Sequence, residues 1–175
     1  IDQEVKKLAS YLTSYQFTQV QRTALANHLE SVTDKTLQQL LHQELTRKRK
    51  LEEKILADIL TYIGKHPGLA EDFQRLKRIS GIGEKLAFSL LFLFRHYQGT
   101  NRAQITALAG LDPIYKESGT SVKGKIKINK NGNRYIRKML YLPTLCAIQN
   151  NRKIAVFYKR LIDHHKPKKV AIIAC

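Results

Sequence analysis

The sequence is poor in cysteine and has no long apolar stretch. Its two cysteines, Cys146 and Cys175, form neither a metal-ligand spacing nor a disulfide framework, so a reducing, cytoplasmic location is expected. The apolar run Leu86–Phe94 is shorter than the roughly 18 residues that a membrane span needs, and Arg95 and His96 follow it at once. The sequence therefore predicts no membrane partner, and no signal peptide is recognised.

Acidic residues are scarce as well. The chain has 14 Asp and Glu against 31 Lys and Arg, which gives a formal net charge of +17. Asp112 and Glu117 stand alone between predicted helices, and the histidines do not combine with carboxylates or cysteines at a metal-ligand spacing. No metal site and no cofactor are predicted for these residues.

The positive charge is concentrated toward the end of the chain. Residues 1–100 carry 15 basic and 11 acidic side chains, whereas residues 101–175 carry 16 and 3. A basic segment of this kind is the electrostatic footprint of phosphate binding, so a polyanion such as DNA is the predicted partner. A basic RNA-binding protein of ribosomal type is an alternative that composition does not exclude.

Apolar periodicity predicts a mainly α fold that begins with a long antiparallel helical hairpin. Residues 3–31 read as one helix, with a break at 16–21 as an alternative because that stretch is more polar. Asp34 is predicted to cap a second helix that runs to about Ile63. Its apolar stripe is formed by Leu37, Leu41, Leu45, Leu51, Ile55 and Ile59.

A helix of about 30 residues is about 45 Å long and cannot bury such a stripe in a small globule. We expect it to pair with residues 3–31 or with another subunit. The predicted domains are a coiled-coil dimerisation arm, 1–66, and a compact helical domain, 67–175. The chain opens with Ile1 and stops at Cys175 inside an apolar run, so a piece of a longer protein is expected.

Residues 79–87, Ile-Ser-Gly-Ile-Gly-Glu-Lys-Leu-Ala, join two predicted helices at about 69–79 and 84–97. This pattern is typical of a helix-hairpin-helix, in which Gly81 and Gly83 let the backbone approach a phosphate and Lys85 adds a charge. Ile79 and Ile82 are expected to point inward. A tight turn that only packs two helices is the alternative.

A basic segment follows a short helix at about 103–109. Between the turn signals Ser118-Gly119 and Asn131-Gly132, apolar residues alternate with lysines, which predicts a short basic β-hairpin or loop. Asn133 is predicted to cap a helix at about 134–149, with Pro143 as a kink or break, and helices at about 153–164 and after Pro167 complete the domain. The candidate DNA-binding residues of the segment are Lys116, Lys123, Lys125, Lys127, Lys130, Asn133, Arg134, Arg137 and Lys138.

Ser118 and Ser121 stand among these cations. A serine hydroxyl attacks a phosphate only where its proton is removed and the developing charge is stabilised. The cations satisfy the second condition, but no local pattern supplies a base. From the residues alone, a serine before glycine is more often a turn residue.

Taken in order, several motifs resemble the C-terminal domain of DEDD-type insertion-sequence transposases, the enzymes of a class of mobile elements. These motifs are Ile-Ser-Gly-Ile-Gly-Glu-Lys (79–85), Ala-Gly-Leu-Asp-Pro (109–113), Ser-Gly-Thr-Ser-Val-Lys-Gly (118–124), the segment 128–140, Phe-Tyr-Lys-Arg-Leu (157–161) and Lys-Pro-Lys-Lys-Val-Ala (166–171). The family includes bridge-RNA-guided recombinases and, as a relative, the pilin-gene invertase. The resemblance covers about residues 70–175, whereas the arm resembles the coiled-coil linker of the family only in kind.

The resemblance implies a function in DNA transposition and recombination. By motif position Ser118, with Ser121 as the fallback, matches a serine that forms a covalent phosphoserine link to DNA. It also implies an N-terminal RuvC-like domain, outside this sequence, whose four acidic residues bind a divalent metal such as Mg²⁺. Assembly from two subunits through the arms, and a guide RNA as a further partner, are implied in the same way.

Two functions therefore stay open. The first is the DNA-binding, serine-bearing part of a transposase, which by itself binds DNA without recombining it. The second is a helix-hairpin-helix module that binds DNA or RNA without catalysis and dimerises through its arm.

Overall fold

The computed structural model describes residues 3–114, 117–118, 122–123 and 127–175, with the backbone alone at 117, 118, 122 and 123. Contacts divide the chain into two compact units. The first contains residues 1–74 and 91–96, and the second contains residues 75–90 and 97–175. The predicted boundary after residue 66 stays a prediction.

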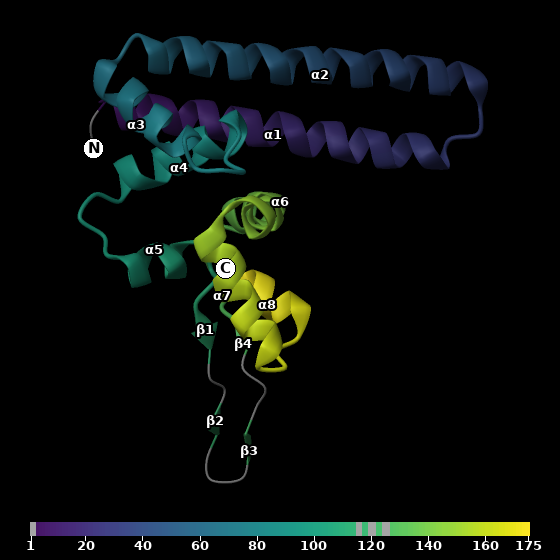
Figure 1. Ribbon diagram of the computed structural model, residues 1–175. Helices are drawn as coiled ribbons and strands as arrows, with labels where there is room; N and C mark the ends of the chain where they lie inside the picture. The colour runs from purple at the N-terminus through teal and green to yellow at the C-terminus, as the bar shows by residue number, and fades with distance from the viewer. Residues whose placement is uncertain (1–2, 115–116, 119–121, 124–126) are drawn as a thin grey trace. The chain divides into compact units, whose positions relative to one another are not determined.

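The first unit is built on a helical hairpin. Helices α1 (Gln3–Ser31) and α2 (Lys35–Gly64) lie side by side in opposite directions (Figure 1). Asp34 caps α2 as predicted, because its side chain accepts a hydrogen bond of 2.8 Å from the Leu37 amide. Side chains spaced by three and four line the buried seam of α1: Val5, Leu8, Leu12 and Tyr15.

The apolar stripe predicted for α2 is partly wrong. Leu37 and Leu51 are 53% and 44% exposed, whereas Glu52, which is not part of the predicted stripe, is 6% exposed. The buried positions follow a repeat of seven residues through Leu45, Glu52 and Ile59. A carboxylate therefore occupies a seam position between two apolar layers, and neighbouring leucines are turned toward solvent.

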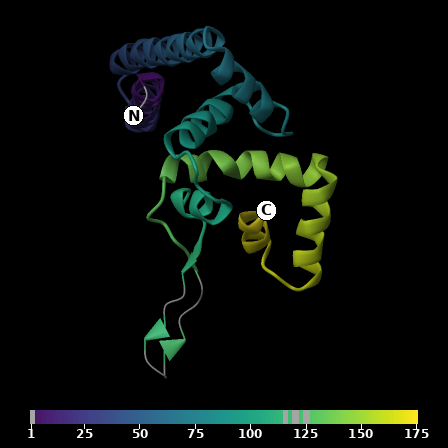
Figure 2. The same cartoon turned by 90° about the vertical axis from the view of Figure 1, so that its left-hand side faces the viewer.

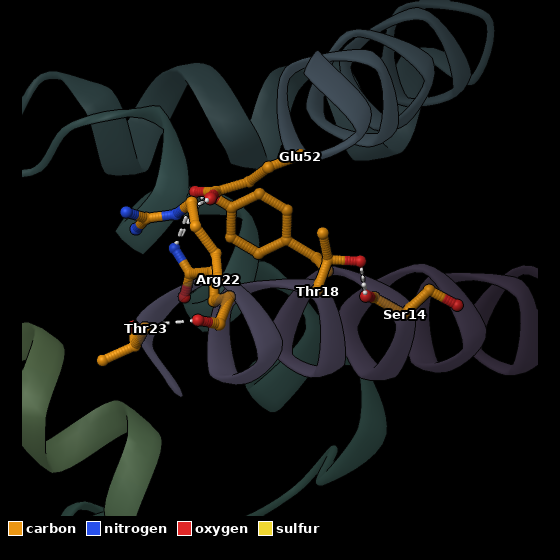
Figure 3. Close-up of polar contacts among 7 residues, drawn as sticks. Ser14, Thr18, Arg22, Thr23 and Glu52 are labelled. Carbon is orange, nitrogen blue, oxygen red and sulfur yellow. Dashed lines mark hydrogen bonds and ion pairs between the residues drawn. The ribbon is translucent and has the colours of Figure 1, made fainter. Parts of the chain in front are cut away.

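Polar partners from α1 make this burial of Glu52 possible (Figure 3). Its Oε1 accepts hydrogen bonds from the Tyr15 hydroxyl, 3.0 Å, and from Gln19 Nε2, 2.9 Å, and its Oε2 pairs with Arg22 Nε at 2.8 Å. The polar stretch 16–21 consequently continues α1 without a break, because Gln19 belongs to a buried polar layer. A buried carboxylate is stable only with such donors around it.

Removal of the cation from this layer has a predictable cost. Arg22→Ala leaves the Glu52 carboxylate without its ion pair, so we expect the free energy of unfolding to fall by about 2 kcal/mol. Glu44→Ala removes exposed pairs to Arg47 and Lys48, and its expected cost is below about 0.5 kcal/mol. Urea unfolding of both variants measures the difference, and equal losses would contradict the proposed stabilisation.

Helix α3 (Pro67–Lys77) begins in the first unit, and the end of α4 (Glu84–His96) returns to it. Leu69 and Phe73 of α3 are buried. Arg95 Nη2 donates to Asp72 Oδ2 at 2.6 Å and to the Gly68 carbonyl at 2.9 Å, which ties the two segments together.

The second unit contains α5 (Arg102–Leu108), α6 (Arg134–Asn150), α7 (Arg152–Asp163) and α8 (Lys168–Ala174). Figure 2 shows α7 leaving α6 at a steep angle, and α6, α7 and α8 contact one another. Asn101 caps α5 through a capping box with Gln104. The buried side chains of this unit include Leu86, Ala87, Phe88, Ala109, Ile136, Ala147 and Ala171.

Two short antiparallel strand pairs lie between α5 and α6. Strand β1 (Pro113–Ile114) pairs with β4 (Lys127–Ile128), and Pro113 is opposite Ile128. Strand β2 (Glu117–Ser118) pairs with β3 (Val122–Lys123), and Ser118 is opposite Val122. We call these two pairs the β-ribbon, and they confirm that a short hairpin accompanies the mainly α fold.

Two local expectations are corrected. Ile79 is 46% exposed and does not point inward, because Gly81 takes the inner position of this turn. Helix α6 continues through Pro143 to Asn150, so Pro143 does not break it, and the alternative of a kink stays a prediction. No described helix is both long enough and apolar enough to cross a membrane.

Candidate nucleic-acid interface

The base of the β-ribbon is held by backbone contacts between the end of α5 and the start of α6. The Asn133 amide donates to the Leu108 carbonyl at 2.7 Å, and the Asn129 amide donates to the Asp112 carbonyl at 2.7 Å. The Asn129 side chain also donates to Asp112 Oδ2 at 3.1 Å. The two chain segments that carry the ribbon therefore start from one fixed point.

Two glycines make this close approach possible. Gly110 has a φ of 68°, and a Cβ there would lie 2.6 Å from the Asn129 carbonyl oxygen. A Cβ on Gly132 would lie 2.5 Å from the Leu108 carbonyl oxygen and would also overlap the Gly110 nitrogen. Only glycine fits at either position without backbone movement.

The cations around this base divide into two groups. Lys127, Lys130, Arg134 and Lys138 are exposed, and we call these four residues the cation cluster. Arg137 is half-buried and donates from Nη1 to the Ala109 carbonyl at 3.0 Å, so it supports the base of the ribbon. Of the three predicted DNA-binding cations that α6 carries, Arg134 and Lys138 are thus presented to solvent and Arg137 is not.

Asn133 lies at the same place and caps α6. Its Oδ1 accepts from the amides of Tyr135 and Ile136, at 2.9 and 3.2 Å. A DNA contact by Asn133 stays a prediction. Asn133 is exposed, and the NH₂ group of its side chain would donate to DNA.

The remaining predicted residues of the ribbon are described only in part. Ser118 and Lys123 have their backbones in β2 and β3. Lys116, Ser121 and Lys125 lie outside the described residues. The backbone thus places Ser118 in the β-ribbon, which also contains Lys127 of the cation cluster. The choice between Ser118 and Ser121 stays open.

The turn between α3 and α4 has a different geometry at each glycine. Gly81 has a φ of 92°, and a Cβ there would lie 2.7 Å from the Pro143 carbonyl oxygen of α6. A Cβ on Gly83 would have no neighbour within 4 Å. Gly81 therefore permits close packing, and Gly83 is the glycine with room for a ligand beside it. Lys85 is exposed at the start of α4, where Glu84 pairs with Lys77 at 3.1 Å.

Metal-ligating groups, the Cys175 thiol and the Asp112 carboxylate are the other chemically relevant features of the described residues. No group of three His, Cys, Asp or Glu side chains in that part of the chain is placed to hold a metal ion. Burial raises the pKa of the Cys175 thiol, which keeps it protonated at neutral pH. Asp112 Oδ1 is buried and has no hydrogen-bond partner among the described residues.

Residues 73–159 match the model of the transposase IS116/IS110/IS902 family. The chain carries a transposase domain of this family. A search of the curated proteins gives no match. The matched range of the transposase domain contains both candidate serines, the β-ribbon and the whole cation cluster.

One charged surface of the second unit was not predicted from the sequence. Along α7 the exposed residues recur at helical spacing and form one cationic face, which ends at the single acid Asp163. The basic members of this face are Arg152, Lys153, Lys159 and Arg160. The signal in the sequence was the repeat of two basic pairs seven positions apart, 152–153 and 159–160, which places them on one helix face.

Proposed function

We propose that this chain is the DNA-binding, serine-bearing part of a transposase that acts in DNA transposition. The observation that carries the proposal is the position of Ser118 on a β-ribbon whose base is bordered by the exposed cation cluster. The match to a transposase family supports a role in transposition. The charge distribution supports DNA as the substrate.

The segment that carries the cation cluster contains no acidic residues. No Asp or Glu occurs in residues 118–162, so the field of the cation cluster is not cancelled by acids nearby in sequence. Lysine and arginine contacts to phosphates fix the position of DNA and release bound counterions. Binding at this surface is therefore expected to depend on salt and to be largely independent of base sequence.

The proposed reaction is a transesterification. The Ser118 oxygen attacks the phosphorus of a DNA phosphodiester, a P–O bond to deoxyribose breaks, and a phosphoserine diester forms. The serine proton leaves with a base and the departing deoxyribose oxygen gains a proton, so no net oxidation occurs. The cations stabilise the negative charge that develops on the phosphate oxygens.

Divalent metal ions, implied by the resemblance, would supply further charge stabilisation. Among the described residues, no group of three His, Cys, Asp or Glu side chains is placed to hold such an ion. We propose that a second domain supplies these ligands. Oligomerisation through the arm and the use of a guide RNA remain predictions from the resemblance.

The DNA-binding part is tested by the salt dependence of affinity. Replacement of each of Lys127, Lys130, Arg134 and Lys138 by Gln should lower the slope of log K against log salt by about 0.9 for each phosphate that is no longer neutralised. The fourfold variant should bind duplex DNA at least about 10-fold more weakly at low salt. Fluorescence anisotropy with a labelled duplex measures both quantities.

Lys50→Gln is the matched control for the single replacements. Lys50 is exposed on α2 in the first unit, and its replacement also removes one positive charge. Its slope should equal that of the parent chain. If the fourfold variant binds within twofold of the parent, the cation cluster does not contact DNA.

The alternative function, a binding module without catalysis, makes the same predictions for affinity. The two functions differ in the predicted effect of replacing the serine. For a module without catalysis, the replacement would leave every activity of the assembled protein unchanged. The serine variants described in the Discussion separate the two functions.

A further inference from the structure

The second half of α6 presents an apolar surface to solvent. Leu142 is 72% exposed and Tyr141 is 50% exposed, on a helix whose opposite side is packed. Met139 contacts Ser89, with 3.8 Å between Sδ and the Ser89 hydroxyl, and Pro143 lies against Gly81. The two exposed residues are thus not part of the packing that holds α6 in place.

The helical repeat places these residues on one face with two cations. Arg134, Lys138, Tyr141 and Leu142 are separated by four, three and one positions, and all four are exposed. Residues 139–151 contain no charged side chain at all, and Arg152 and Lys153 follow directly. The exposed face therefore has cations at its start and an uncharged aromatic and aliphatic surface after them.

This combination fits one kind of ligand chemically. A fully paired duplex presents phosphates outside and shields the faces of its bases, so it satisfies the cations but not Tyr141 and Leu142. A nucleic-acid strand with unstacked bases offers phosphates and exposed base faces together. Aromatic side chains beside a basic groove bind such strands by stacking.

We propose that the exposed face of α6 binds unpaired bases of a single DNA strand, with Tyr141 and Leu142 against the bases and Arg134 and Lys138 on the backbone. The inference deepens the proposed function, on which it rests, and it names the substrate at this place as locally unpaired DNA. Tyr141 and Leu142 are positioning residues for the strand and take no part in bond breaking.

The test compares single-stranded and fully paired DNA of the same sequence with the complete chain. Tyr141→Ala should weaken binding of the single strand about 10-fold and change binding of the duplex less than twofold. Alanine is the residue best suited to a helix, so this change should leave α6 folded. The slope of log K against log salt should be unchanged, since stacking releases no counterions, whereas Arg134→Gln should lower the slope for the single strand by about 0.7.

Two variants and one probe complete the experiment. Tyr141→Phe retains a ring that stacks and should bind the single strand as the parent does. Tyr97→Ala, at an exposed tyrosine outside α6, should have no effect. A 2-aminopurine base in the strand should lose fluorescence on binding to the parent chain and keep it with Tyr141→Ala.

Each contrary result has a definite meaning. Equal losses for single strand and duplex would show a general binding defect and overturn the assignment of unpaired DNA. An unchanged affinity for the single strand, with a loss of self-association or of binding to anionic vesicles, would assign the face to a second copy or to a lipid surface. Either outcome overturns this inference and leaves the salt-slope test of the cation cluster intact.

Discussion

Ser118→Ala should abolish strand exchange when this chain is joined to a RuvC-like domain in a complete transposase. The substitution removes the oxygen that would attack phosphorus, so we expect a loss of at least about 1,000-fold. Affinity for DNA should change less than twofold, because the cations that position the backbone are retained. Product formation on a radiolabelled duplex and anisotropy measure the two quantities side by side.

Ser121→Ala serves as the comparison, since Ser121 is the fallback nucleophile. Loss with Ser121→Ala and full activity with Ser118→Ala would transfer the proposed role to Ser121. Denaturation of the reacting complex should also leave DNA attached to the protein through the serine. Normal strand exchange by the double variant would exclude a serine nucleophile and favour the module without catalysis.

Gly132→Ala should strongly destabilise the second unit. The new Cβ would overlap three backbone atoms, which include the carbonyl oxygens of Leu108 and Ala107 at 2.5 and 2.6 Å. Backbone atoms cannot turn aside as a long side chain can, so the two segments must separate. We expect a loss of about 3 kcal/mol, or about 6–12 °C in Tm, with binding of DNA reduced as the ribbon loses its base.

Gly83→Ala is the matched control, because a Cβ there meets nothing within 4 Å. It should change Tm by less than about 2 °C. Differential scanning calorimetry of both variants measures the effect. If Gly132→Ala melts with the parent, the close contact between Gly110 and Gly132 does not support the ribbon.

Local signals in the sequence were enough to predict the helices. Asp34 and Asn133 cap α2 and α6 through bonds from their own side chains, and a cap depends only on the next few residues. The helix at residues 3–31 was predicted from its apolar periodicity, and Val5, Leu8 and Tyr15, which recur at helical spacing, are buried. These features need no knowledge of the rest of the chain.

The errors arose where a residue's place is decided by a distant partner. Glu52 is buried because Tyr15, Gln19 and Arg22 of another helix supply donors, and nothing near Glu52 in sequence shows this. Gly81 packs against the carbonyl of Pro143, 62 positions later, and Ile79, two positions before Gly81, is exposed. Arg137 was predicted as a DNA-binding residue like its basic neighbours, but its guanidinium donates a hydrogen bond to the Ala109 carbonyl.

The candidate site was predicted as a set of residue types and not as an arrangement. Composition identified the basic segment, and the resemblance identified its serines. The exposure of Tyr141 and Leu142 was not predictable, because apolar side chains on a helix are normally assigned to the core.

The carboxylate of Glu52 also fixes the alignment of the two long helices. A displacement of α2 by seven residues, which would carry Glu52 toward Leu8, would separate the carboxylate from its donors Tyr15, Gln19 and Arg22 and would place the apolar Leu45 opposite them. A register shift of the hairpin therefore costs more free energy than the same shift would cost in a purely aliphatic repeat. The position of this single polar layer therefore determines which turns of α1 and α2 face each other along the hairpin.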